Sequence, residues 1–186
     1  FVHTGADGER EFSFYRKPGA DMMLSEEDVP EQLIENCKIF HFGSLSMTSE
    51  RCEKATKKAI EIAKKSGAIV SFDPNLRENL WDSLDTAKEK IRYGLSKCDI
   101  LKISDNEIQW LTGEEDFDAA VNALRQEFDI PLIFLTLGKD GSRAYSLSGC
   151  YAEEPVIEAN SIEKTGAGDT FFGCALARVL ACKKLD

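Results

Sequence analysis

Four short runs of β-branched and aromatic residues recur along the chain, and each is followed by residues with helical periodicity. The runs lie at 38–42, 68–72, 99–103 and 132–136. They are almost continuously apolar, as expected for parallel strands that are covered on both faces. Successive runs start about thirty residues apart, which is the length of a βαβ unit. The pattern predicts a layered α/β fold with right-handed connections.

Apolar residues at helical spacing predict three helices between these runs, over 50–65, 84–97 and 117–128. Ser49 and Ser83 precede the first two helices, at the position where a hydroxyl can cap the first turn. Gly67 is expected to end the first helix. The alternation of strands and helices therefore extends over most of the chain.

Two segments do not follow this alternation. Residues 1–16 predict a β-hairpin whose strands are joined at Gly5-Ala6-Asp7-Gly8. Residues 143–157 also have the composition of strands and not of a helix. No linker of low complexity and no internal repeat divides the sequence.

The net charge of the chain limits its partners. The 186 residues are 42% hydrophobic and 30% charged, and 33 acidic against 23 basic side chains give a net charge of -10. This charge repels the phosphates of nucleic acids and anionic lipids, so we expect no nucleic acid and no membrane as partner. No apolar run approaches the ~18 residues of a membrane span. A phosphorylated ligand would need backbone amides, a metal or suitably placed arginines.

The cysteines and histidines indicate a compartment and exclude one class of metal site. Six cysteines are scattered without a CxxC motif, and His3 and His41 are the only histidines, so a zinc cluster is not expected. Scattered cysteines in a core-forming chain favour a reducing compartment, and we expect a cytoplasmic protein. The chain starts at Phe1 and ends within a predicted helix, so we also expect an internal piece of a longer fold.

The sharpest local feature is a loop of small residues that leads directly into an amphipathic helix. It reads Thr165-Gly166-Ala167-Gly168-Asp169. Its glycines allow close approach of the backbone to a ligand, and the first-turn amides and helix dipole favour an anion. Asp169 could cap the helix or act as a general base, and the flexible Gly-Ala-Gly before it favours the base. The loop fits neither GxGxxG nor the Walker A motif.

Residues 165–176 closely resemble the C-terminal signature of the ribokinase/PfkB carbohydrate kinases. Other segments fit the same family in the same order. Residues 71–77 with Leu80-Trp81 resemble the DPNxR…LW segment of fructokinases and 2-keto-3-deoxygluconate kinases, and residues 14–21 are similar to a fructokinase stretch beside the sugar pocket. The remaining matches are 102–107, similar to the NxxE region, and 136–141, similar to the nucleotide-binding TLGxxG loop.

The resemblance implies a ribokinase-like three-layer α/β/α fold with a mostly parallel sheet. Residues 1–16 would form part of a small β lid, and residues 17–186 the main α/β kinase domain, incomplete at both ends. In the full-length protein the lid would pair two subunits into a homodimer. Within the family the segments near the lid and the DPNxR loop face the sugar, which implies a fructokinase-like enzyme.

The resemblance also implies roles for individual residues. Gly166, Ala167 and Gly168 would form an anion hole beside the catalytic base Asp169. The residues implied in ATP binding are Asn75, Ser104, Thr136, Gly138, Lys139 and Gly141. Those implied for the substrate are Arg16, Arg77 and Asp169, and Glu107 would organise Mg²⁺ through water. Ser104 stands where many ribokinases have the Asn of NxxE.

The residues themselves leave simpler alternatives open. Arg77 could be a solvated loop cation, Glu107 a first-turn helix acid and Arg16 a charge on an edge strand. Gly138 and Gly141 could be turn residues between two strands.

The function implied is ATP-dependent phosphorylation of a sugar hydroxyl, with fructose first and 2-keto-3-deoxygluconate second. A non-catalytic fragment that binds nucleotide or sugar is the alternative. A Rossmann dehydrogenase is disfavoured, because neither its glycine fingerprint nor its acidic residue stands at the required place.

Overall fold

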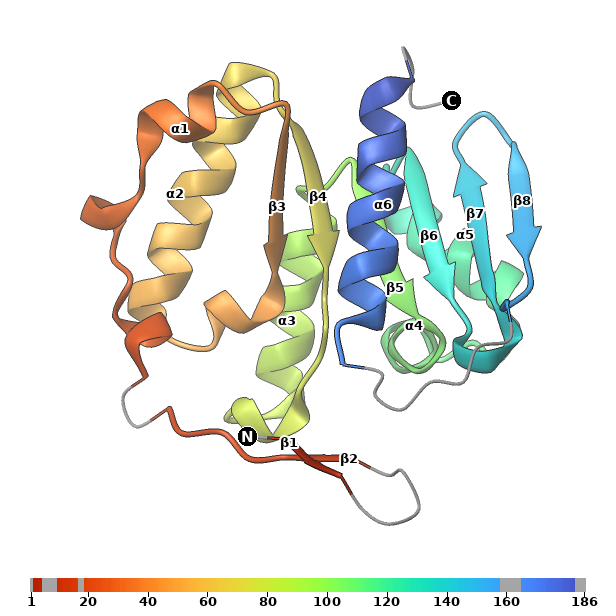
Figure 1. The fold of residues 1–186 in the computed structure, drawn as a ribbon, viewed down its shortest axis with the longest axis horizontal. Helices are drawn as coiled ribbons and strands as arrows, with labels where there is room; N and C mark the ends of the chain where they lie inside the picture. Colours follow the sequence, from red (N-terminus) through yellow and green to blue (C-terminus); the bar gives the residue numbers. More distant parts are fainter. Residues whose placement is uncertain (1, 5–9, 17–18, 158–164, 183–186) are drawn as a thin grey trace.

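The computed structural model describes residues 2–4, 10–16, 19–157 and 165–182. Its central element is a six-stranded sheet in the order β3-β4-β5-β6-β7-β8 (Figure 1). The first four strands are parallel to one another, and β7 and β8 are antiparallel additions. The strands are β3 Ile39–Gly43, β4 Ile69–Asp73, β5 Ile100–Ser104, β6 Leu132–Thr136, β7 Ser142–Ser146 and β8 Tyr151–Glu154. The four predicted strands and the mostly parallel sheet are confirmed.

The three predicted helices are confirmed as α2, α3 and α5, and the sequence analysis missed α1 and α4. The helices are α1 Glu31–Glu35, α2 Glu50–Ser66, α3 Leu84–Leu95, α4 Asp105–Thr112, α5 Phe117–Glu127 and α6 Ala167–Ala181. Gly67 ends α2 in the left-handed conformation (φ 76°), as predicted. Ser83 caps α3 by accepting a bond from the Thr86 amide at 3.1 Å. Ser49 stands at the N-cap of α2, as predicted, but its hydroxyl makes no cap bond and is buried without a partner among the described residues.

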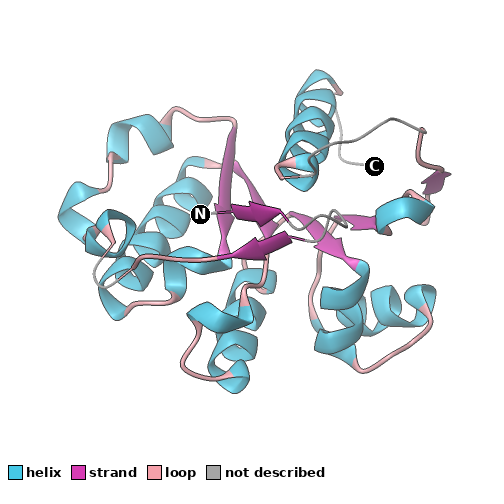
Figure 2. Cartoon of the chain, turned by 60° about the horizontal axis from the view of Figure 1, so that its bottom comes forward, coloured by secondary structure: helices cyan, strands magenta, loops and turns pink. Residues whose placement is uncertain are grey.

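The helices form two layers on opposite faces of the sheet (Figure 2). Because β3, β4, β5 and β6 follow one another both in sequence and in the sheet, their right-handed connections put α2 to α5 on one face. Helix α6 lies on the other face. The packing of α3 is tight enough that a Cβ at Gly94 would lie 2.5 Å from the Phe72 ring. The three-layer α/β/α arrangement is therefore confirmed.

The two faces of the sheet differ in polarity. Toward α2–α5 the strands present fully buried apolar side chains, among them Phe72, Leu101, Ile103, Ile133 and Leu135. Since side chains alternate along a strand, the residues between these face α6. They include Ser71, Asp73, Lys102, Ser104, Phe134 and Thr136. On the face toward α6 the prediction that apolar residues line both faces holds for the first half of the strands, where Ile69, Ile100 and Leu132 lie, and fails at their carboxyl ends.

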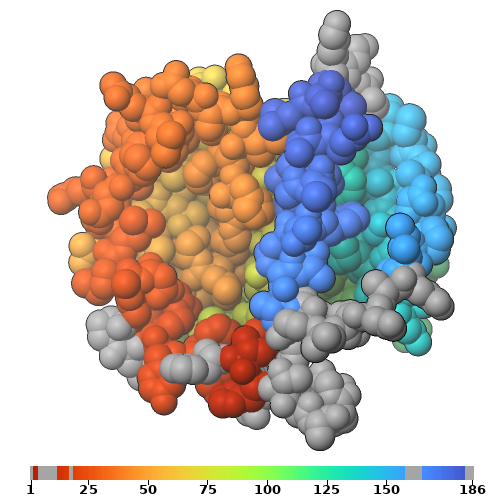
Figure 3. Space-filling view, viewed as in Figure 1, coloured from red at the N-terminus to blue at the C-terminus, as the bar shows by residue number. Residues whose placement is uncertain are grey.

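Helix α6 forms a ridge on this polar face (Figure 3). Phe172 is its one fully buried side chain within the described residues. The Phe172 ring lies 6.2 Å from the ring of Phe134 on β6. An apolar groove of about 590 Å³ runs along β3 beside α1 and α2. A second groove of about 320 Å³ separates α6 from β7 and β8.

A separate two-stranded sheet lies at the end of the molecule where the parallel strands finish (Figure 1). Strand β1 (Val2–Thr4) pairs antiparallel with β2 (Arg10–Phe12), which agrees with a hairpin at the N-terminus. The turn predicted at residues 5–8 lies outside the described residues. The pairing ends at Phe12, earlier than the strand expected to reach Tyr15. In the described part of the chain, no helix has the length and apolar character needed to cross a membrane.

Candidate active site

A polar cavity of about 480 Å³ opens at the carboxyl ends of β4 and β5. In an open α/β sheet this end is where ligands bind. The predicted site residues that line it are Asn75, Arg77, Ser104, Glu107, Gly166, Ala167, Gly168 and Asp169. Phe12, Asp73, Lys102 and Thr165 complete the lining. Three of the segments singled out in the sequence thus meet at one cavity.

The start of α6 is shaped by its glycines. Gly166 is the N-cap in the left-handed conformation (φ 78°), and its carbonyl accepts the Thr170 amide at 2.8 Å. Asp169 lies in the first turn with an exposed side chain and is not the N-cap, so the capping interpretation of this carboxylate does not apply. A Cβ at Gly168 would lie 3.2 Å from the Lys102 Nζ. First-turn amides and a carboxylate therefore border the same cavity.

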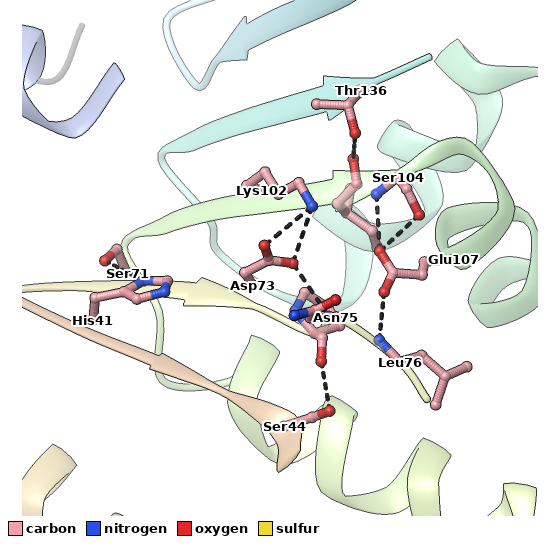
Figure 4. A network of polar contacts seen from close by, with 12 residues as sticks. His41, Ser44, Ser71, Asp73, Asn75, Leu76, Lys102, Ser104, Glu107 and Thr136 are labelled. Carbon is pink, nitrogen blue, oxygen red and sulfur yellow. Dashed lines mark hydrogen bonds and ion pairs between the residues drawn. The ribbon is translucent and has the colours of Figure 1, made fainter. Parts of the chain in front are cut away.

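A buried ion pair forms the floor of the cavity. The Lys102 Nζ lies 3.0 Å from Asp73 Oδ2, and the two side chains are 10% and 6% exposed (Figure 4). Burial raises the pKa of Asp73 to about 6, although the neighbouring Lys102 charge acts in the opposite direction. The sequence analysis assigned no role to either residue. A lysine within an otherwise apolar strand was the available signal, because a lysine is almost never buried unpaired.

The loop after β4 is fixed by local hydrogen bonds. Asn75 has a left-handed backbone (φ 45°), which Asn tolerates better than most residues. Its backbone N–H donates to Asp73 Oδ1 at 3.2 Å. The Ser44 hydroxyl donates to the Pro74 carbonyl at 2.5 Å, which ties the loop to the end of β3. The Arg77 guanidinium lies over the Phe12 ring, 5.5 Å from its centroid. Arg77 thus lines the cavity and is not a free loop cation.

Glu107 is held by backbone and hydroxyl donors. Ser104 donates to Glu107 Oε2 from its amide at 3.0 Å and its hydroxyl at 2.8 Å, which forms a capping box at the start of α4. The Leu76 amide donates to Oε1 at 2.7 Å (Figure 4). The first-turn interpretation therefore applies to Glu107, whatever further role it has.

The residues present fit a hydrated Mg²⁺ better than a directly ligated one. Within the described residues, no three His, Cys, Asp or Glu side chains gather as a metal site. Glu107 Oε2 already accepts two hydrogen bonds from Ser104, whereas Oε1 accepts one from the Leu76 amide and retains a lone pair for a water. Since Mg²⁺ keeps several of its waters, one carboxylate at the cavity wall is a sufficient protein contribution.

The predicted nucleotide loop lies apart from this cavity. Thr136 ends β6, Gly138, Lys139 and Gly141 follow it, and none of the four lines the cavity. Gly138 (φ 57°) and Gly141 (φ 103°) have backbones that favour glycine. A Cβ at Gly141 would meet the Glu154 carbonyl oxygen, so backbone packing alone accounts for this glycine.

Arg16 is also separate from the cavity beside Asp169. Its guanidinium pairs with Asp21 at 2.6 Å and donates to the Leu45 carbonyl at 3.4 Å. It lines a different cavity, of about 770 Å³, together with Asn79 and Asp82. The exposed-edge interpretation of Arg16 is wrong, because both sides of its guanidinium have partners. Its predicted role in substrate binding stays a prediction.

Asp169 also borders a second, smaller cavity of about 170 Å³. This cavity lies toward β3, and its other lining residues are His41, Gly43, Ser44, Leu45, Ser46, Asp73 and Asn75. The first cavity offers the cations of Arg77 and Lys102 and helix amides, whereas the second offers the hydroxyls of Ser44 and Ser46 and the imidazole of His41. The Asp73 carboxylate borders both. The Asp169 carboxylate therefore stands where two sites of different chemistry meet.

The chain is similar to known fructokinases over nearly its whole length. The chain is 40% identical over 180 residues to probable fructokinase-2 of Arabidopsis thaliana, covering 97% of this chain and 54% of that protein. Fructokinase-1 of Oryza sativa subsp. japonica is 41% identical over 180 residues, with 97% and 55% covered. The chain thus spans about half the length of these relatives.

Solved structures show the same fold. The fructokinase with bound ATP from Xylella fastidiosa matches with a TM-score of 0.80 and 31% identity, over 92% of this chain and 53% of that one. The Vibrio cholerae fructokinase with fructose, ADP and calcium ion bound matches with a TM-score of 0.84 and 28% identity, over 98% and 59%. The family model described as pfkB family carbohydrate kinase matches residues 1–186. The chain belongs to the pfkB family of carbohydrate kinases.

Proposed function

We propose that the protein transfers the γ-phosphoryl group of ATP to a hydroxyl of a sugar. The observation that carries the proposal is the position of Asp169 between a cavity lined by amides and cations and a cavity lined by hydroxyls. A phosphoryl donor suits the first cavity and a polyol suits the second. The hydroxyl and the phosphorus would then meet beside a carboxylate, which is the arrangement that phosphoryl transfer requires.

In this proposal Asp169 accepts the proton of the attacking hydroxyl. The amides of Ala167, Gly168 and Asp169 donate to the oxygens of the transferred group, where negative charge increases in the transition state. Lys102 and Arg77 supply cations on the wall of the same cavity. Glu107 would hold a hydrated Mg²⁺, which offsets the charge of the β- and γ-phosphates.

Fructose is the sugar that the comparisons favour. The relatives at about 40% identity are named fructokinases, and a solved relative holds fructose and ADP. This favours fructose over 2-keto-3-deoxygluconate. ATP as the donor is supported by the ATP-bound fructokinase of Xylella fastidiosa. Pairing of two subunits through residues 1–16 and a cytoplasmic location stay predictions, as do the roles of Thr136, Gly138, Lys139 and Gly141 in binding the nucleotide.

The proposal is tested by steady-state kinetics of the full-length protein with ATP and a panel of ketoses, aldoses and keto-deoxy acids. Asp169→Asn should lower kcat by about 10²–10⁴-fold, because the general base is lost. Asp85→Asn is the matched control, since Asp85 is an exposed first-turn acid of α3 outside both cavities, and it should leave kcat unchanged. Nearly normal turnover of Asp169→Asn would refute the assigned role. ATP binding without phosphorylation of any sugar would favour the non-catalytic alternative.

A further inference from the structure

His41 is fixed on two sides of its ring at the edge of the small cavity. It lies in the middle of β3, in register with Ser71 of β4. Its Nδ1 is 3.0 Å from the Ser71 hydroxyl (Figure 4). Its ring meets the Phe172 ring of α6 at 5.4 Å and 77°, an edge-to-face contact. The imidazole therefore has a defined orientation.

The bonds of Ser71 favour one tautomer of this ring. The Ser71 Oγ also lies 3.5 Å from the Phe40 carbonyl oxygen, and a carbonyl can only accept. The single hydroxyl proton of Ser71 is thus directed to Phe40, and its oxygen accepts from an Nδ1–H of His41. Burial lowers the pKa of His41, which favours the neutral ring. A neutral ring with its proton on Nδ1 has a bare, accepting Nε2.

The accepting nitrogen of His41 has no partner in the described part of the chain, where Ser71 is the one hydrogen-bond partner of the ring. His41 is exposed and lines the small cavity together with Asp169. The Nε2 edge is turned toward the end of β4 that carries Asp73 (Figure 4). Besides the Asp73 carboxylate, which already accepts from Lys102 and from the Asn75 backbone N–H, the small cavity contains two acceptors, the Asp169 carboxylate and the His41 nitrogen. A ligand with two hydroxyls is the complement of such a pair.

We propose that His41 determines specificity by accepting a hydrogen bond from a second hydroxyl of the sugar while Asp169 takes the proton of the reacting one. This inference rests on the proposed function and identifies a part of the acceptor site. Contact with a second hydroxyl would orient the sugar so that only one of its hydroxyls reaches Asp169. An acceptor at the cavity wall that the wrong sugar leaves unpaired would also discriminate against that sugar.

Two substitutions test the Nδ1 and Nε2 interactions of His41 independently. In His41→Asn the amide can replace Nδ1 and keep the bond to Ser71, but nothing replaces Nε2. In His41→Gln the amide oxygen can reach the position of Nε2. We expect His41→Asn to raise the KM for the sugar by about threefold to tenfold, the cost of one hydrogen bond, with an unchanged KM for ATP. We expect His41→Gln to recover most of this loss.

Monodeoxy analogues of the accepted sugar identify the hydroxyl. For the analogue that lacks the contacted hydroxyl, wild type and His41→Asn should have equal kcat/KM, and for every other analogue the wild type should remain better. The same ratio of wild type to variant on all analogues would overturn the inference, as would an equal rise in the KM for ATP. Failure of the wild type to phosphorylate any sugar would instead overturn the proposed function together with this inference.

Discussion

Burial and the ion pair with Lys102 shift the pKa of Asp73 in opposite directions, so one measurement shows which effect is larger. Burial raises the pKa of Asp73 from its ordinary value of 3.8 to about 6, even with Lys102 lowering it. The Asp73 side chain is 6% exposed and lies 3.0 Å from the Lys102 Nζ. Burial is thus the larger of the two effects on this carboxyl. The substitution that tests this is Asp73→Asn, which removes the titrating group and keeps its shape.

The sign of the effect follows from the direction of the shift. The folded state holds the Asp73 proton to a higher pH than the unfolded chain does. The contribution of Asp73 to stability is therefore fully present below pH 4, and it is lost as the pH rises through about 6. At about 1.4 kcal/mol for each pH unit, the loss is about 3 kcal/mol. This is a sizeable share of a stability of about 5–15 kcal/mol.

The assay is urea unfolding of wild type and Asp73→Asn at several pH values between 4 and 7. The free energy of unfolding of the wild type, minus that of the variant, should fall by about 2.4 kcal/mol over this range, most of the full effect. Asp73→Asn also removes the charged partner of Lys102. This changes the difference in unfolding free energy by the same amount at every pH and leaves its dependence on pH unchanged. Asp85→Asn, an exposed control, should give a flat difference. A difference that rises with pH would refute the reasoning, since the Lys102 charge would then outweigh burial.

Three glycines give further predictions. Gly168→Ala puts a methyl group 3.2 Å from the Lys102 Nζ and should lower kcat about tenfold or more, measured by steady-state kinetics. Gly173→Ala, in the same helix with nothing within 4 Å, should keep kcat and raise the free energy of unfolding by about 0.5–1 kcal/mol; equal losses of kcat in both variants would contradict this. Gly94→Ala meets the Phe72 ring at 2.5 Å and should cost about 1–3 kcal/mol in urea unfolding, and wild-type stability would mean that the ring can move away.

Much of the fold could be predicted because its strands and long helices have strong local patterns. The β-branched runs gave all four parallel strands, and helices of eleven residues or more showed a clear apolar face. Helix α4 was missed because it has eight residues and starts directly where β5 ends. Its signal was nevertheless present, since Ser104 and Glu107 have the spacing of a capping box. The alternative that Glu107 is a first-turn helix acid was open from the sequence, and the capping box supports it.

The site could be predicted where the chain carries a compact motif. Residues 165–169 and the loop at Asn75 and Arg77 meet at one cavity, as their positions after strand ends suggested. His41 and Lys102 could not be assigned from the sequence, because their roles depend on the neighbours that the sheet register provides. For a single polar residue in an apolar strand, the sequence does not show which face of the sheet its side chain lies on or which side chains it contacts there.

Helix α6 carries Asp169, so the proposed chemistry depends on how firmly this helix packs on the sheet. With one side chain deep in the sheet, the helix that carries Asp169 has far fewer apolar contacts than α2 or α3. Such an element should open locally more often than the other layer, and its amides should exchange with deuterium sooner. The loop at residues 165–169 would then lose its geometry on warming before the sheet does. Activity should accordingly vanish at a lower temperature than the one at which the sheet unfolds.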